Sequence, residues 1–287
     1  MTRKINPSIV WAILAAALYA ISTPVSKLLL EDIPPTMMAA LLYLGAGIGM
    51  LLLGLVRKGL GKGQAERKLT RKDLPFTVGM IVLDIAAPIC LMVGLTTTSP
   101  ANASLLNNFE IVATSIIALS VFKEKISKRL WLSIGLITLS SVILSFEGVS
   151  SFRFSVGSLF VLLACICWGF ENNCTRMMSQ SDPLEIVVLK GFGSGLGALS
   201  IALVVGAQIP ALRFILVSLL LGFVAYGLSI FFYVYAQRKL GAAKTSAYYA
   251  VAPFIGVALS LLIFWKLPSP SFWVALLIME VGTYLAA

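Results

Sequence analysis

Residues 35–56 read PTMMAALLYLGAGIGMLLLGLV and contain no charged side chain, whereas Arg57 and Lys58 follow at once. An apolar helix of about 20 residues is long enough to cross the hydrocarbon core of a bilayer. Similar stretches recur along the whole chain, separated by segments that carry Pro, Gly or clustered charge. They lie at 8–30, 35–56, 74–96, 101–122, 130–148, 156–178, 184–207, 213–236, 243–265 and 271–287. The sequence therefore predicts an all-α integral membrane protein with ten transmembrane helices.

The composition excludes most other classes of protein. Of the 287 residues, 59% are hydrophobic and 12% are charged, and the mean hydropathy is +0.97. In soluble proteins about a quarter of the residues are charged. Spans of this length satisfy their own backbone hydrogen bonds in lipid, whereas the strands of a membrane barrel have about ten residues and alternate in polarity. The net charge of +10 is spread over short segments between the spans, so we expect a lipid bilayer as partner and no nucleic acid.

The basic residues predict the orientation of the chain. Counting from the N-terminus, 17 of them lie in the N-terminal tail and the even-numbered loops, and four lie on the other side. The first group is Arg3, Lys4, Arg57, Lys58, Lys62, Arg67, Lys68, Arg71, Lys72, Lys123, Lys125, Lys128, Arg129, Arg176, Arg238, Lys239 and Lys244. The second group is Lys27, Arg153, Arg213 and Lys266. Because short cytoplasmic loops are rich in Lys and Arg, we predict a bacterial plasma (inner) membrane protein with both termini in the cytoplasm.

The chain also repeats itself. Residues 101–105 (ANASL), ahead of the fourth span, parallel residues 243–247 (AKTSA), ahead of the ninth, 142 positions further on. Residues 18–27 of the first span similarly parallel residues 167–176 of the sixth. A unit of five helices makes the second copy enter the membrane from the opposite side. We therefore predict two inverted repeats, 1–148 and 149–287, with a binding site near the midplane where they meet.

The residues around the fourth span carry a family resemblance. The run 96–106 (TTTSPANASLL), Glu110 and the run 122–127 (FKEKIS) resemble the EamA-type repeat of the drug/metabolite transporter superfamily. Ile111 stands where that repeat often has proline after the glutamate, whereas Pro253 keeps the proline in the second half. The resemblance implies a central cavity lined by helices one, three, four, six, eight and nine. It also implies the transport of amino acids, nucleotide sugars, other metabolites or organic cations.

Five ionisable side chains fall inside the spans, where a charge costs about 2.5–3.5 kcal/mol at a helix centre. They are Asp84, Glu110, Glu171, Lys190 and Glu280. Such groups face the interior of a bundle or a water-filled cavity. Asn107, Glu110 and Thr114 share one helical face, so Asn107 and Glu110 are predicted substrate-binding residues. The alternative is a polar clasp between two helices.

A second polar stripe lies on the sixth span. Trp168, Glu171, Asn172 and Thr175 fall at helical spacing, and we predict that the first three line the cavity. The matching stripe on the first span adds Tyr19 and Ser22 as predicted lining residues. The alternative for Glu171 is a structural ion pair with Lys190, since a buried charge needs a partner, and we assign Lys190 a structural role. Asp84 and its repeat counterpart Tyr226 are each expected to offer one polar group to the cavity.

Tyrosines complete the predicted site. Tyr226 and Tyr233 follow one stripe of the eighth span, and Tyr248 and Tyr249 lie in the ninth. These phenols can stack on a solute and hydrogen-bond to it, and aromatic rings beside carboxylates suit a cation. Simple packing of the rings is the alternative.

A secondary transporter that works by alternating access explains these patterns best. We expect export of an amino acid or a similar amphipathic metabolite; the alternatives are transport of a drug or quaternary organic cation and, more remotely, an intramembrane enzyme. Glu110 and Glu171 are the candidates for proton coupling, because the chain contains no histidine. We expect no cofactor, no metal site and no catalytic residue. Gly45 and Gly49 can pack within the bundle or between two copies, so a monomer or weak homodimer is expected.

Overall fold

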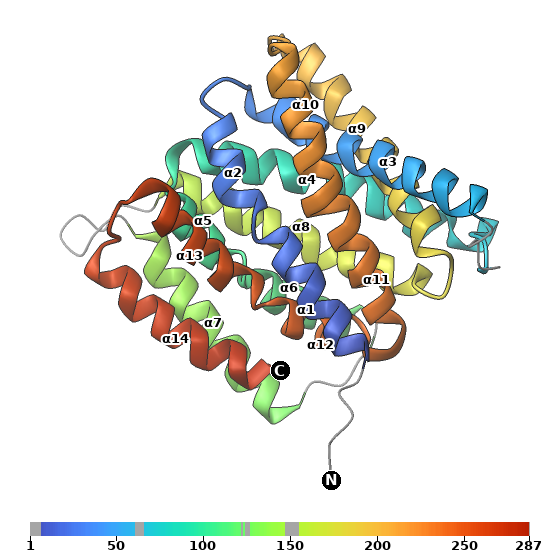
Figure 1. The fold of residues 1–287 in the computed structure, drawn as a ribbon. Coiled ribbons are helices and arrows are strands. Elements are labelled where there is room, and N and C mark those ends of the chain that lie inside the picture. The colour runs from blue at the N-terminus through green and yellow to red at the C-terminus, as the bar shows by residue number, and fades with distance from the viewer. Residues whose placement is uncertain (1–6, 61–65, 122, 124–126, 147–154, 287) are drawn as a thin grey trace.

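A computed structural model describes residues 7–60, 66–121, 123, 127–146 and 155–286. In these residues every regular element is a helix and none is a strand, which confirms the predicted all-α fold (Figure 1). Arg3, Lys4, Lys62, Lys125, Arg153 and most of the run 122–127 lie outside the described residues.

Nine helical segments in the described part of the chain are long and apolar enough to cross a membrane. They are α1–α2 (Pro7–Tyr19, Ser22–Leu29), α3 (Pro35–Gly59), η1–α4 (Arg71–Asp73, Leu74–Thr97), α5–α6 (Pro100–Leu106, Phe109–Ser120), α7 (Lys128–Ser145), α8 (Val156–Met178), α9 (Pro183–Val204), α10–η2–α11 (Leu212–Leu221, Gly222–Leu228, Ser229–Leu240) and α12–α13 (Ala242–Tyr249, Ala252–Phe264). A tenth apolar helix, α14 (Pro270–Ala286), is shorter. Each predicted span corresponds to one of these segments.

Three of the spans are broken near their middle. Proline has no backbone N–H, so Pro24 and Pro253 cannot donate the helical bonds to the carbonyls four residues earlier, at Ala20 and Tyr249. The first span accordingly breaks between α1 and α2, and the ninth breaks between α12 and α13. The fourth span breaks at the equivalent place, between α5 and α6. No proline causes this break, since Ile111 occupies the position that corresponds to Pro253.

The two halves of the chain are packed into each other. The most extensively packed helix pairs, α3 with α9, α4 with α8, and α7 with α14, each combine one helix from either half (Figure 1). A β-carbon on Gly45 would lie 2.1 Å from the Leu219 carbonyl oxygen, and one on Gly222 would lie 2.0 Å from that of Leu42. Glycine at both positions therefore lets the backbones of α3 and α10–η2 touch. Gly49 likewise packs against Phe223 of the same chain.

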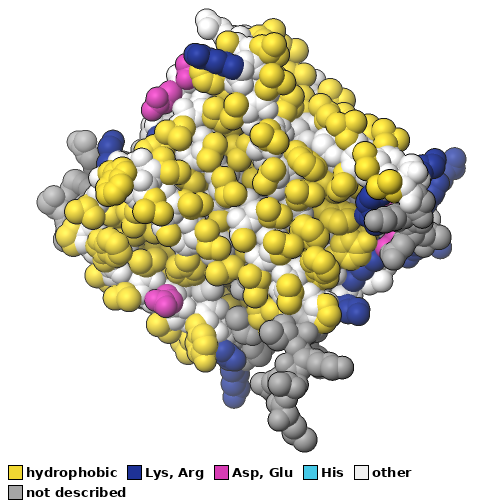
Figure 2. Space-filling model, viewed as in Figure 1, with side chains coloured by type: hydrophobic (Ala, Val, Ile, Leu, Met, Phe, Trp, Pro, Cys, Tyr) yellow, Lys and Arg dark blue, Asp and Glu magenta, His cyan; other side chains and the backbone are white. Residues whose placement is uncertain are grey.

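Apolar side chains cover the molecular face shown in Figure 2, and Lys and Arg side chains gather toward its edges. Helix α1 begins, and helices α3 and α11 end, on one side of the bundle, which we call the basic end. Figure 1 shows that α14 also ends on this side. There the Arg238 guanidinium donates to the carbonyls of Ser179 and Ser181, at 2.6 Å each, and pairs with Glu66 at 3.0 Å. This clasp joins the ends of α8 and α11 to the segment ahead of α4.

Candidate functional site

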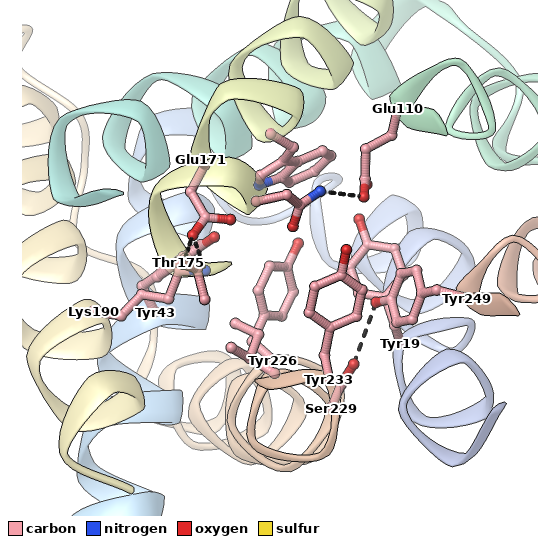
Figure 3. Close-up of a pocket in the computed structure, with 13 residues that line it drawn as sticks. Tyr19, Tyr43, Glu110, Glu171, Thr175, Lys190, Tyr226, Ser229, Tyr233 and Tyr249 are labelled. Carbon is pink, nitrogen blue, oxygen red and sulfur yellow. Dashed lines mark hydrogen bonds and ion pairs between the residues drawn. The ribbon is translucent and has the colours of Figure 1, made fainter. Parts of the chain in front are cut away.

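A small cavity of about 50 Å³ lies in the middle of the bundle, where the broken spans meet α3, α8 and α9 (Figure 3). It is lined by Tyr19 of α1, Tyr43 of α3, Glu110 of α6, Trp168, Glu171, Asn172 and Thr175 of α8, Lys190 of α9, Tyr226 of η2, Ser229, Ile230 and Tyr233 of α11, and Tyr249 of α12. Both halves of the chain thus supply its wall. A volume of this size holds only a few water molecules, so the side chains nearly fill the site.

One side of the cavity is a buried charge cluster. The Lys190 ammonium lies 2.8 Å from Glu171 Oε1 and 3.0 Å from Asp84 Oδ2, and all three side chains are at most 4% exposed. The Tyr43 hydroxyl donates to Asp84 Oδ1 at 2.8 Å, and the Thr175 hydroxyl donates to Glu171. Each charge therefore has the partners that burial requires. With all groups ionised, the cluster carries a net charge of −1.

Glu110 stands apart from this cluster, across the cavity from Lys190 (Figure 3). Its Oε1 accepts a hydrogen bond of 2.7 Å from the Asn172 amide, which also donates to Thr114 Oγ1 at 3.3 Å. Lys190 is the only cation among the lining residues, and it is bound to the other two carboxylates. Glu110 thus presents a carboxylate to the cavity without a cation against it among the described residues.

Aromatic rings fill the space between Glu110 and the buried charge cluster. The Tyr19 ring lies 6.3 Å from that of Trp168, 5.6 Å from that of Tyr226 and 5.7 Å from that of Tyr249, measured between centroids. The Tyr226 ring also lies 5.2 Å from that of Tyr43. Such a wall offers both π faces and hydroxyl groups to a bound solute.

Most of the residues predicted from sequence converge here. Glu110, Glu171, Asn172, Trp168, Tyr19, Tyr226, Tyr233 and Tyr249 all line the cavity. Asp84 lies behind the wall, bound to Lys190 and Tyr43, rather than offering a free group. Ser22 also lies outside the lining and donates to the Tyr226 hydroxyl at 3.3 Å. Asn107 borders a second, smaller chamber beside Glu110.

Tyr248 borders neither cavity, because the next residue along α12, Tyr249, takes the inward direction and neighbouring side chains on a helix point about 100° apart.

Two lining positions differ from the expectation. The third span contributes no lining residue, whereas the second and seventh spans contribute Tyr43 and Lys190. Sequence reasoning assigned no role to Tyr43. A tyrosine in an otherwise apolar span was the signal that could have indicated a polar partner inside the bundle, because a buried tyrosine hydroxyl usually has a hydrogen-bond partner. Lys190 keeps its structural pairing and lines the cavity as well.

The described residues contain no group of three or more His, Cys, Asp and Glu side chains placed to hold a metal ion. The chemistry that this site offers is reversible binding: an acidic group, an ion-paired cluster and an aromatic wall enclosed between two halves of one chain.

Comparison with known proteins identifies the architecture. A model of the EamA-like transporter family matches residues 6–146 and, a second time, residues 155–287. The chain belongs to the EamA-like transporter family. It is therefore an integral membrane transporter, and the predicted resemblance is confirmed.

Two relatives of this EamA-like transporter carry transporter names. An "Uncharacterized transporter" of Methanothermobacter thermautotrophicus is 25% identical over 271 residues, which cover 88% of this chain and 77% of the relative. The "Uncharacterized transporter YyaM" of Bacillus subtilis is 22% identical over 240 residues, which cover 79% of this chain and 76% of the relative. A protein of known crystal structure shares the fold with a TM-score of 0.75 and 15% identity, over 98% of this chain and 96% of the other.

Proposed function

We propose that this EamA-like transporter is a secondary carrier for a small amine-bearing organic solute, which it exports across the plasma membrane by alternating access. In this proposal the basic end faces the cytoplasm, and both termini lie there. The asymmetry of Lys and Arg along the sequence supports that orientation.

The observation that carries the proposal is the Glu110 carboxylate at the cavity wall, which has no Lys or Arg against it in the part of the chain that the structure describes. Counted with Asp84, the ionised groups in and behind the wall carry a net charge of −2. A dry site with excess negative charge favours a ligand that brings positive charge. The aromatic rings beside Glu110 add attraction for an ammonium group, worth about 0.5–2 kcal/mol for each well-placed ring.

The architecture supports a carrier rather than a channel. The walls come from two intertwined halves, and the cavity is nearly filled by its own side chains, so a solute can enter only when helices move apart. Inverted repeats provide such a motion, because the two halves can exchange conformations around a shared site. The breaks in the first, fourth and ninth spans lie beside the cavity and give these helices places to bend.

Two solute classes fit an ammonium site. Amino acids are the first, because Asn172 and the hydroxyls of Ser229, Tyr226 and Tyr233 offer hydrogen bonds to the remainder of the solute. Quaternary organic cations are the second, favoured by the ring of aromatic side chains. Amino acids need hydrogen-bonding groups in the cavity wall, whereas quaternary cations do not.

We propose that Glu110 carries the coupled proton. The sequence also makes Glu171 a candidate, but its carboxylate is engaged by Lys190 and Thr175, whereas Glu110 can exchange a proton for a cationic solute. The solute's ammonium needs an ionised Glu110, so solute binding is expected to weaken as the pH falls.

Counterflow in proteoliposomes tests the proposal. Vesicles loaded with an unlabelled amino acid or quaternary amine should accumulate the labelled solute transiently and saturably. Glu110→Gln should abolish flux driven by a pH gradient. A glutamine amide does not take up or release a proton, so it cannot alternate between binding a proton and binding the ammonium group of the solute. An unchanged pH dependence in Glu110→Gln would refute the role of Glu110, and the absence of counterflow for any amine would refute the solute class. Glu185→Gln, at the basic end, serves as the control carboxylate.

A further inference from the structure

A second polar chamber lies beside the central cavity, at the place where the broken fourth and ninth spans meet. It has a volume of about 10 Å³, close to the minimum for one water molecule. Asn107, Asn108 and Glu110 of the α5–α6 break line it, together with Ser246, Tyr249 and Pro253 from around the α12–α13 break. Glu110 borders both the chamber and the central cavity.

Asn108 is the unusual residue of this chamber. The residue is 1% exposed, and among the described residues neither its amide nitrogen nor its amide oxygen has a hydrogen-bond partner. An unsatisfied buried polar group costs about 1–3 kcal/mol, and native proteins rarely leave one without a ligand or water. The amide oxygen of Asn108 is therefore available to a ligand inside the chamber.

Asparagine often occurs at helix breaks because its side chain bonds to nearby backbone groups. Asn108 makes no such bond to any residue that the structure describes, so its amide does not stabilise the break between α5 and α6. The repeat-related break between α12 and α13 has Tyr249 and Ala250 in place of Asn107 and Asn108, and Ala252 in place of Glu110. The amide and carboxylate groups are thus present in one repeat only.

We propose that this chamber binds a sodium ion. Amide, carboxylate and backbone carbonyl oxygens are the ligands that hard cations prefer, and interrupted helices supply such oxygens inside membranes. The chamber offers the Asn108 amide oxygen and the Glu110 carboxylate, and its small volume favours a small ion. The negative charge of Glu110 selects a cation over an anion.

Sodium binding in the chamber does not depend on the proposed carrier function, whereas its effect on transport rests on that function. A sodium ion in the chamber and an ammonium group in the central cavity would share the Glu110 carboxylate. Their like charges would make each weaken the binding of the other, and such coupling is reciprocal. Sodium would then exchange for the amine across the membrane.

The test uses the purified full-length protein in detergent and does not depend on transport. The melting temperature is measured in NaCl, KCl and CsCl at equal ionic strength and pH, and ²²Na⁺ retention is measured directly. We expect sodium to raise the melting temperature saturably, potassium and caesium to have no such effect, and ²²Na⁺ to be retained specifically.

Asn108→Leu has nearly the shape of the native side chain and carries no polar group. It should raise the apparent Kd for ²²Na⁺ at least tenfold. In CsCl the variant should melt no lower than the native protein, because the unsatisfied amide is gone. Asn102→Leu is the matched control; its amide donates to the Leu144 carbonyl on α7, and the variant should keep the native response to sodium.

Equal melting temperatures in all three salts without ²²Na⁺ retention would overturn the proposal, because the chamber would then hold water alone. An equal rise in potassium would overturn the assignment to sodium, and native sodium binding in Asn108→Leu would overturn the location. These results stand whether or not counterflow of an amine is observed, so the failure of the ion site is distinct from failure of the carrier function.

Discussion

Replacement of Lys190 by methionine tests the buried charge cluster on which the shape of the cavity depends. Lys190 Nζ lies 2.8 Å from Glu171 and 3.0 Å from Asp84, so the two contacted oxygens are at most about 5.8 Å apart. At an effective dielectric constant of about 20, two unit charges at that distance repel by about 3 kcal/mol. Removal of one partner of a buried ion pair generally costs about 3–5 kcal/mol. We therefore expect Lys190→Met to lose about 3–5 kcal/mol of unfolding free energy.

The assay is equilibrium unfolding of the purified protein by SDS in mixed micelles, followed by far-UV circular dichroism. Lys239→Met, at the exposed end of α11, is the matched control and should change the unfolding free energy by no more than about 0.5 kcal/mol. A triple variant, Lys190→Met with Asp84→Asn and Glu171→Gln, removes every charge of the cluster. It should recover at least about 2 kcal/mol relative to Lys190→Met, because no uncompensated charge remains buried.

Equal stability of Lys190→Met and the native protein would refute the reasoning, since it would mean that water reaches Asp84 and Glu171. A triple variant as unstable as Lys190→Met would also contradict it, because the loss would then come from side-chain packing rather than from unpaired charge.

Three further predictions follow from individual contacts. Gly222→Ala should destabilise the fold by about 1–3 kcal/mol, because its β-carbon would lie 2.0 Å from the Leu42 carbonyl oxygen. Gly59→Ala, whose β-carbon would have no atom within 4 Å, should leave the stability unchanged, and SDS unfolding distinguishes the two variants. Arg238→Lys keeps the charge but loses the planar fork that reaches Ser179, Ser181 and Glu66, so it should lower the unfolding free energy by about 1–3 kcal/mol, and stability equal to that of the native protein would argue against the clasp. Tyr19→Ala should raise the apparent KM for an amine about 2–30-fold through loss of the ring, while Tyr19→Phe should stay within about twofold in the same counterflow assay; equal effects would exclude a role for the aromatic face.

The site was partly predictable because helical periodicity groups residues of one helix. The stripes Trp168–Glu171–Asn172 and Tyr226–Tyr233 lie on the cavity wall as the spacing predicted. The same reasoning assigned Asp84 to the cavity and gave Tyr43 no role. Whether a buried polar residue meets the cavity or a neighbouring helix depends on the partner helix, and spacing within one span carries no information about that partner.

The sequence by itself determined the membrane spans, the asymmetry of basic loops and the five-helix repeat. These are local or periodic properties, and lipid imposes them on each span separately, because every backbone polar group must be satisfied within its own helix. Only the tertiary structure decided that four helices bring Tyr43, Asp84, Glu171 and Lys190 into one cluster. It also decided that Glu110 faces the cavity with no cation of the described residues against it. Helix pairing in a bilayer is set by close contacts such as Gly45 on Leu219, between residues more than a hundred positions apart, and no local pattern specifies them.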